Sequence, residues 1–125
     1  MKTIEFTKEM KLLAISYDKD FTEETINFWY QNFKNINKDI FTKAVKKAIT
    51  NNKYMPSIAE LLDICKKEQK NAKVLVLEKM KSDNYFKTSK EYEKVIKWIE
   101  KDITPEWLLN DMKNYYINNQ KLLGE

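Results

Sequence analysis

The sequence contains no histidine and no arginine, and it has one cysteine, Cys65, and one glycine, Gly124. Histidine is the commonest general base and metal ligand at neutral pH, so its absence removes the usual constellations of hydrolases and metalloenzymes. A single cysteine excludes an intramolecular disulfide and a thiolate zinc site. A single glycine leaves no glycine-rich loop for a phosphate or a dinucleotide. We therefore expect a protein that is not an enzyme and that uses no metal and no cofactor.

Long apolar runs and an excess of one charge are also lacking. No stretch approaches the roughly 20 apolar residues of a membrane-spanning helix, and no apolar signal region follows Met1, so we expect a soluble, cytoplasmic protein with no membrane partner. Ten lysines face eight acids in residues 1–62 and thirteen face eleven in 63–125, so each half carries a charge of +2. Without arginine, bidentate contacts to guanine are excluded, whereas a phosphate-binding surface of lysines stays open.

The residues that are present predict an all-α fold. The chain has 125 residues, of which 42% are hydrophobic, enough for a real core. Apolar residues recur at spacings of three and four, and the interior has no glycine for tight hairpin turns. We expect five to seven helices and no sheet, in a compact amino-terminal helical bundle (1–69) followed by a second helical, partner-binding segment (70–125).

Capping signals predict where the helices begin. Ser57 with Glu60, and Thr88 with Glu91, have the spacing of capping boxes. Helices are predicted over about 7–17, 23–35, 37–51, from Ser57 onward, 89–101 and 105–117, with Thr22, Asn37 and Thr104 as further caps.

Three local features carry further expectations. In the first helix, Leu12 and Ile15 are expected to widen the buried stripe. The polar stretch 66–73 is expected to be a helix end or a solvent-exposed bridge between the two halves. Residues 74–77 have β-branched character, but we expect a helix because no second strand is available for pairing.

A stripe of lysines is predicted on the third helix and just after it, formed by Lys43, Lys46, Lys47 and Lys53, with Tyr54 beside it. Such a stripe could follow a nucleic-acid backbone, and the tyrosine could stack on a base. The same pattern is also what the solvent side of an amphipathic helix has in a lysine-rich chain.

The last helix carries more aromatic and apolar surface than one packing stripe requires. The surplus residues are Trp107, Met112, Tyr115 and Tyr116. Trp, Tyr and Met are enriched at the centres of protein interfaces, and a helix near a terminus can dock in a partner's groove. The alternative is that this helix simply packs on the helix before it.

Three segments of the first half resemble the bacteriophage replicative-helicase loader/inhibitor family. They are DFTEETINFWY at 20–30, AVKKAI at 44–49 and MPSIAEL at 55–61. Their order and spacing match that family over about residues 5–65, and the Pro-Ser-Ile-Ala-Glu run after the third helix is the most specific piece. None of these motifs is catalytic, so the resemblance is one of scaffold.

The resemblance implies a phage DNA-replication adaptor in a bacterial host cell. Such a protein binds the hexameric replicative helicase, holds it inactive and delivers it to an origin complex that contains an origin-binding initiator protein. Single-stranded DNA is reached only indirectly, through the helicase. In that family the carboxy-terminal half carries the helicase contact. The alternatives are a small lysine-rich nucleic-acid-binding protein and a phage-encoded inhibitor of another host machine.

Overall fold

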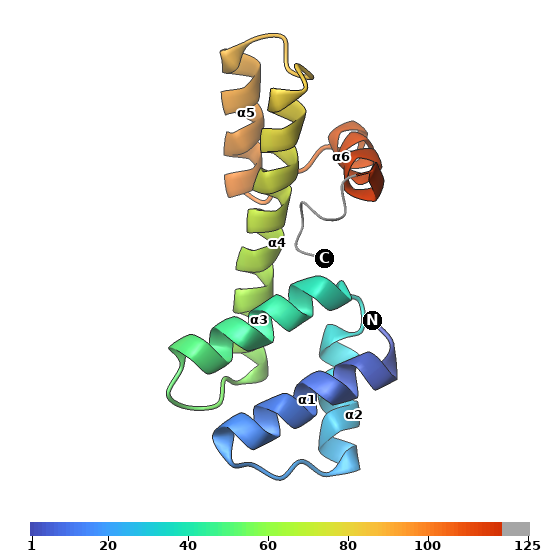
Figure 1. The fold of residues 1–125 in the computed structure, drawn as a ribbon, viewed down its shortest axis with the longest axis vertical. Helices are drawn as coiled ribbons and strands as arrows, with labels where there is room; N and C mark the ends of the chain where they lie inside the picture. The colour runs from blue at the N-terminus through green and yellow to red at the C-terminus, as the bar shows by residue number, and fades with distance from the viewer. Residues whose placement is uncertain (119–125) are drawn as a thin grey trace. The chain divides into compact units, whose positions relative to one another are not determined.

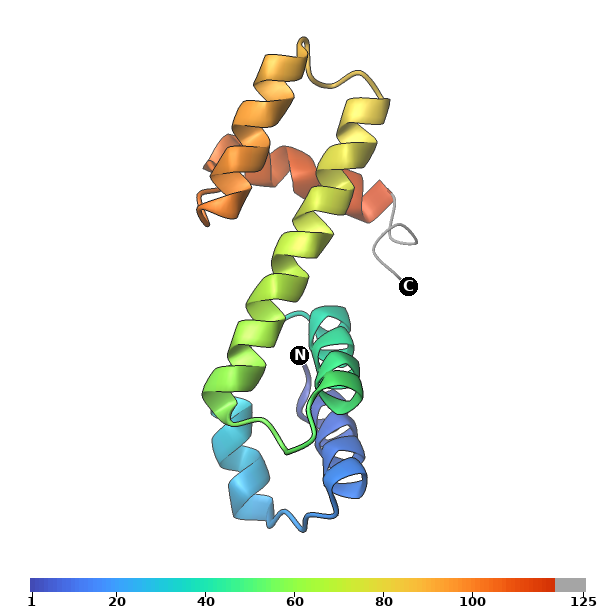
Figure 2. The same ribbon diagram turned by 90° about the vertical axis from the view of Figure 1, so that its left-hand side faces the viewer.

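The chain folds entirely into helices joined by short connections (Figures 1 and 2). This computed structural model describes residues 1–118, and the side chains of residues 1–115. The helices are α1 (Thr3–Tyr17), α2 (Glu23–Phe33), α3 (Lys38–Asn51), α4 (Ile58–Ser82), α5 (Ser89–Glu100) and α6 (Glu106–Asn118). No strand occurs within residues 1–118, so the predicted all-α fold is confirmed. None of the helices in this described part is long and apolar enough to cross a membrane.

Local hydrogen bonds at the helix starts confirm the predicted caps. At α4, the backbone N–H of Glu60 donates to Ser57 Oγ and the N–H of Ser57 donates to Glu60 Oε1, both at 3.1 Å. At α5, the N–H of Glu91 donates to Thr88 Oγ1 at 3.2 Å, but the Glu91 carboxylate accepts from the N–H of Lys87 rather than completing the box. Thr22 and Asn37 cap α2 and α3 in the same way.

Three helix boundaries differ from the prediction. α1 begins at Thr3, four residues early, because the Glu5 carboxylate accepts a hydrogen bond from the N–H of Lys2 and so caps an earlier turn. α6 begins at Glu106, directly after Pro105. The polar stretch 66–73 is neither a helix end nor a separate bridge, since α4 runs through it without a break. It contains no proline or glycine, so nothing interrupts the backbone hydrogen bonds there.

The chain divides into two compact units between Glu68 and Gln69, within α4. The first unit comprises α1, α2, α3 and the beginning of α4. The second unit comprises the rest of α4 with α5 and α6. Each unit has its own hydrophobic core, so each is described separately below.

The core of the first unit is built around three phenylalanine rings, Phe6, Phe33 and Phe41, with centroids 5.1–6.1 Å apart. Its other fully buried members are Met10, Leu13, Ala44, Val45, Ala48, Leu61 and Cys65. The Tyr17 hydroxyl donates to the carbonyl oxygens of Ala48 and Asn52, at 2.7 and 2.9 Å, and so fastens the end of α1 to the end of α3.

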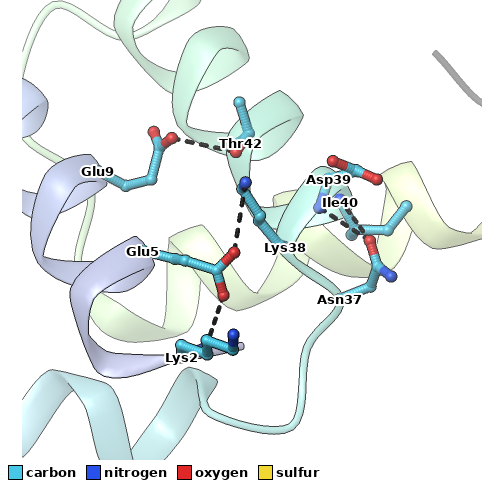
Figure 3. A network of polar contacts seen from close by, with 8 residues as sticks. All are labelled: Lys2, Glu5, Glu9, Asn37, Lys38, Asp39, Ile40 and Thr42. Atoms are coloured by element: carbon cyan, nitrogen blue, oxygen red, sulfur yellow. Dashed lines mark hydrogen bonds and ion pairs between the residues drawn. The ribbon is translucent and has the colours of Figure 1, made fainter. Parts of the chain in front are cut away.

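Polar contacts also join α1 to α3 (Figure 3). Lys38 Nζ lies 3.3 Å from Glu5 Oε2, and the Thr42 hydroxyl donates to Glu9 Oε1 at 3.0 Å. Both carboxylates of α1 are therefore directed toward α3. Leu12 and Ile15 do not widen the buried stripe as expected, because they lie on the other side of α1, where they are 42% and 80% exposed.

In the second unit, the last part of α4 and α5 run side by side, and α6 crosses them (Figure 2). The core contains Val76, Leu77 and Met80 from α4, Val95 and Ile99 from α5, and Leu108 and Met112 from α6. Residues 74–77 are helical, as expected. Each helix thus contributes one apolar face to a shared core.

Candidate partner-binding surface

The connection between α5 and α6 exposes a group of apolar side chains. Trp107, in the first turn of α6, is 52% exposed, and Ile103, in the connection, is 51% exposed. Trp98 of α5 is half-buried, and its ring stands edge-on to that of Trp107, with centroids 6.3 Å apart and planes at 81°. Lys94 Nζ lies 5.2 Å from the centroid of the Trp98 ring. We call these four residues, Lys94, Trp98, Ile103 and Trp107, the tryptophan corner.

The backbone of this corner is fixed by hydrogen bonds. The N–H of Ile103 donates to the carbonyl oxygen of Trp98 at 2.8 Å, across a turn in which Asp102 adopts a left-handed conformation with φ of 60°. Asparagine and aspartate tolerate this region better than other non-glycine residues. The turn therefore presents Ile103 next to Trp98 without needing a glycine.

Two lysines of α4 hold the same turn. Lys70 Nζ lies 3.2 Å from Asp102 Oδ1, and Lys73 Nζ donates to Thr104 Oγ1 at 3.1 Å. The hydroxyl of Thr104, predicted to cap the last helix, is thus engaged by α4. The corner is consequently part of the folded second unit, and its exposed rings do not depend on a loose loop.

Only part of the interface predicted on the last helix lies at the surface. Trp107 is exposed as expected. Met112 is 4% exposed and packs in the core, so its assignment to a docking surface was wrong. Tyr115 is half-buried against that core, with its ring 6.5 Å from that of Tyr85. Tyr116 lies outside the residues whose side chains the structure describes.

Tyr85 explains why the far end of α6 faces inward. Its hydroxyl donates a short hydrogen bond to Asp111 Oδ2 on α6, and its ring contacts both Phe86 and Tyr115 edge-on. Burial, together with the neighbouring Asp111 carboxylate, raises the pKa of Tyr85 to about 12. The tyrosine therefore stays protonated as a donor at neutral pH and ties α6 to the connection after α4.

The lysine stripe of the first unit is smaller than the sequence suggests. Lys47 Nζ lies 2.5 Å from Oε1 of Glu68, a carboxylate that is nearly buried, so this charge is already compensated. Lys43 is half-buried and also has an interaction within the chain. Lys46 is exposed.

Lys53 and Tyr54 follow α3 as an exposed pair. Tyr54 is 76% exposed, and Lys53 Nζ lies 5.6 Å from the centroid of its ring. A ring with a cation beside it can stack on a base near a phosphate. Together with Lys46, this pair is what the structure leaves of the predicted nucleic-acid face.

Sequence analysis missed Trp98 and Ile103 as surface residues. Trp98 falls beside the apolar stripe of its helix, which runs through Val95 and Ile99, and that offset is the signal that could have found it. Ile103 lies in a connection, where no helical period marks it. Their proximity to Trp107 is a tertiary feature.

The corner has the chemistry of a protein-binding site and not that of a catalytic one. Exposed tryptophan with adjacent aliphatic surface is enriched at interface hot spots, and a nearby lysine favours an acidic rim on the partner. Among the described residues, no three cysteine, aspartate or glutamate side chains are grouped to hold a metal ion. The arrangement can bury apolar area against another protein.

Comparison with known proteins concerns the first unit. Residues 1–62 match the family model of the gene 39 protein, N-terminal domain. No curated protein and no solved structure matches the chain. The matched segment includes α1, α2, α3 and the first turn of α4, and the tryptophan corner lies beyond it.

Proposed function

Since residues 1–62 belong to the N-terminal domain family of this phage helicase loader/inhibitor, we propose that the protein is a phage DNA-replication adaptor. It binds the hexameric replicative helicase, holds it inactive and loads it at the origin. The family match is the observation that carries the proposal. The lack of the usual catalytic constellations fits a role through binding.

The tryptophan corner is the surface that we propose for the helicase contact. It lies in the carboxy-terminal half, where the resemblance places this contact. Trp107 and Ile103 are each about half exposed, and full burial of such a side chain contributes roughly 1.5–3 kcal/mol. Because the rings are already ordered by the fold, docking costs little side-chain entropy.

Affinity capture with purified proteins tests this contact. The tagged full chain is mixed with the hexameric replicative helicase of the phage or of its host, and retained helicase and its unwinding activity are measured. We expect the wild-type chain to retain the helicase and to reduce unwinding. Trp107→Ala is expected to weaken retention about tenfold, which corresponds to roughly 1.4 kcal/mol, with an unchanged melting temperature.

Tyr54→Ala provides a matched control, because Tyr54 is also an exposed aromatic residue but lies in the first unit. It should retain the helicase as the wild type does. If the wild-type chain does not retain the helicase, the adaptor proposal is wrong, and inhibition of another host machine becomes the better hypothesis. If both variants bind at full strength, the contact lies elsewhere on the chain.

A second candidate function, nucleic-acid binding, is favoured by the exposed Lys53–Tyr54 pair. Phosphate binding by lysines weakens steeply with salt, whereas an apolar contact is much less sensitive. Titration of a labelled single-stranded oligonucleotide at two salt concentrations separates the two functions. Binding that is tight at low salt and lost in Tyr54→Ala would support this second candidate.

A further inference from the structure

Helix α1 has apolar side chains on two opposite faces. One face, with Phe6, Met10 and Leu13, is fully buried in the core of the first unit. On the other face Ile4 is 67% exposed and Ile15 is 80% exposed. Core packing accounts for the first face only, and two isoleucines in water on one helix indicate a surface that a partner covers.

The spacing of this outer face is that of a helix-pairing seam. Positions 4, 8, 11 and 15 are separated by four, three and four residues, so they line one side of an α-helix, as the a and d positions of a coiled coil do. Ile4 and Ile15 occupy the ends of this seam, and Lys8 and Lys11 occupy its centre. Leu12, 42% exposed, lies on its flank. We call these five residues the α1 outer face.

The charge of the α1 outer face is entirely positive. The two carboxylates of α1, Glu5 and Glu9, point to α3, where they contact Lys38 and Thr42 (Figure 3). Lys8 and Lys11 are exposed, and the ion pairs found among the described residues do not include either of them. A central lysine in an otherwise apolar seam selects the register and the partner of a helix pair.

This charge distribution disfavours a second copy of the chain as the partner. In an antiparallel pair of two such faces, Lys8 would lie opposite the Lys11 position of the other copy, and in a parallel pair each lysine would lie opposite its own equivalent. Like charges in these positions repel. A helix with aliphatic residues at the ends of its stripe and carboxylates at the centre satisfies both parts of the face.

We propose that the α1 outer face docks an acidic amphipathic helix of another protein. The aliphatic residues of that helix pack on Ile4 and Ile15, and its two central carboxylates pair with Lys8 and Lys11. This site is independent of the proposed helicase contact, which uses a different unit of the chain.

Defined peptides test the proposal directly. The acidic probe is a fluorescent peptide, held helical by side-chain bridges, with leucine at the two outer seam positions and glutamate at the two central ones. The basic probe is the same peptide with lysine at the central positions. Fluorescence anisotropy with the full-length chain is expected to show the acidic probe binding about tenfold more tightly than the basic one.

Charge reversal gives the decisive comparison. The variant Lys8→Glu with Lys11→Glu should exchange the preference, so that the basic probe binds better. The matched variant Lys66→Glu with Lys67→Glu, which changes two exposed lysines of α4, should keep the wild-type preference. Ile15→Ser should weaken the acidic probe while the melting temperature stays unchanged, because Ile15 is 80% exposed.

Two results would overturn the proposal. The first is equal binding of the two probes by the wild-type chain, or a preference that charge reversal does not exchange. The second is a concentration-dependent dimer in sedimentation that Ile15→Ser abolishes, which would assign the face to a second copy. A failure to bind the helicase would leave these peptide results unaffected.

Discussion

The ammonium group of Lys47 lies 2.5 Å from a carboxylate oxygen of Glu68, and the side chain of Glu68 is only 7% exposed. This pair joins α3 to the end of the first unit within α4. A lysine that reads in the sequence as part of a phosphate-binding stripe therefore compensates a nearly buried charge. The neighbouring Lys46, one position away, is exposed.

Replacement of Lys47 should destabilise the first unit. Lys47→Ala leaves the Glu68 carboxylate buried without its partner, and we expect a loss of about 1–3 kcal/mol in the free energy of unfolding. Lys46→Ala, on the solvent side, should change it by less than about 0.5 kcal/mol. Urea unfolding followed by circular dichroism measures both, and equal values for the two variants would argue against a stabilising pair.

The capping box of α4 should contribute to stability in a measurable way. Ser57→Ala removes the acceptor for the N–H of Glu60, and a loss of about 1 kcal/mol is expected. Glu60→Ala should also destabilise, by removing the acceptor for the N–H of Ser57. Neither variant should alter partner binding except through folding. A variant that melts normally but fails to bind would reveal a functional role at this helix start.

The thiol of Cys65 should be unreactive in the folded chain. Cys65 is 1% exposed, and burial together with the nearby Glu68 carboxylate raises its pKa to about 12. Thiolate is the reactive form, so a disulfide reagent at pH 8 should label the native protein slowly and the guanidinium-unfolded protein at once. Native labelling as fast as that of a free thiol would show that this part of the core opens.

The stability of the second unit should fall in alkali through Tyr85. Its pKa is raised from about 10 to about 12, so the folded state holds the phenolic proton more tightly than the unfolded state does. The stability that this provides is fully present below about pH 10 and is lost as the pH rises toward 12.

Tyr85→Phe isolates this contribution from the titration of the lysines. At pH 8 the variant should be less stable by about 1 kcal/mol, because it lacks the hydrogen bond to Asp111. The difference from the wild type should shrink between pH 10 and pH 12, as measured by urea unfolding at each pH. A difference that stays constant over this range would contradict the assignment.

The sequence by itself determined the fold class and most helix starts of this protein. The hydrogen bonds of Ser57, Thr22 and Asn37 reach only two or three residues along the chain, so the residues that make them can be read from local spacing. The family resemblance depends on the same local features, and the family match over residues 1–62 confirms it.

The tertiary structure alone decided which apolar and charged residues are available at the surface. The helical period places Ile15 on α1 but does not say which of its two apolar faces packs on the core, and Ile15 proves to be 80% exposed. Met112 and Trp107 are both apolar residues of α6, yet only Met112 reaches the core that α6 shares with α4 and α5. Burial depends on contacts between residues far apart in the chain, and the partners in those contacts are set by how the helices pack, which local spacing does not encode.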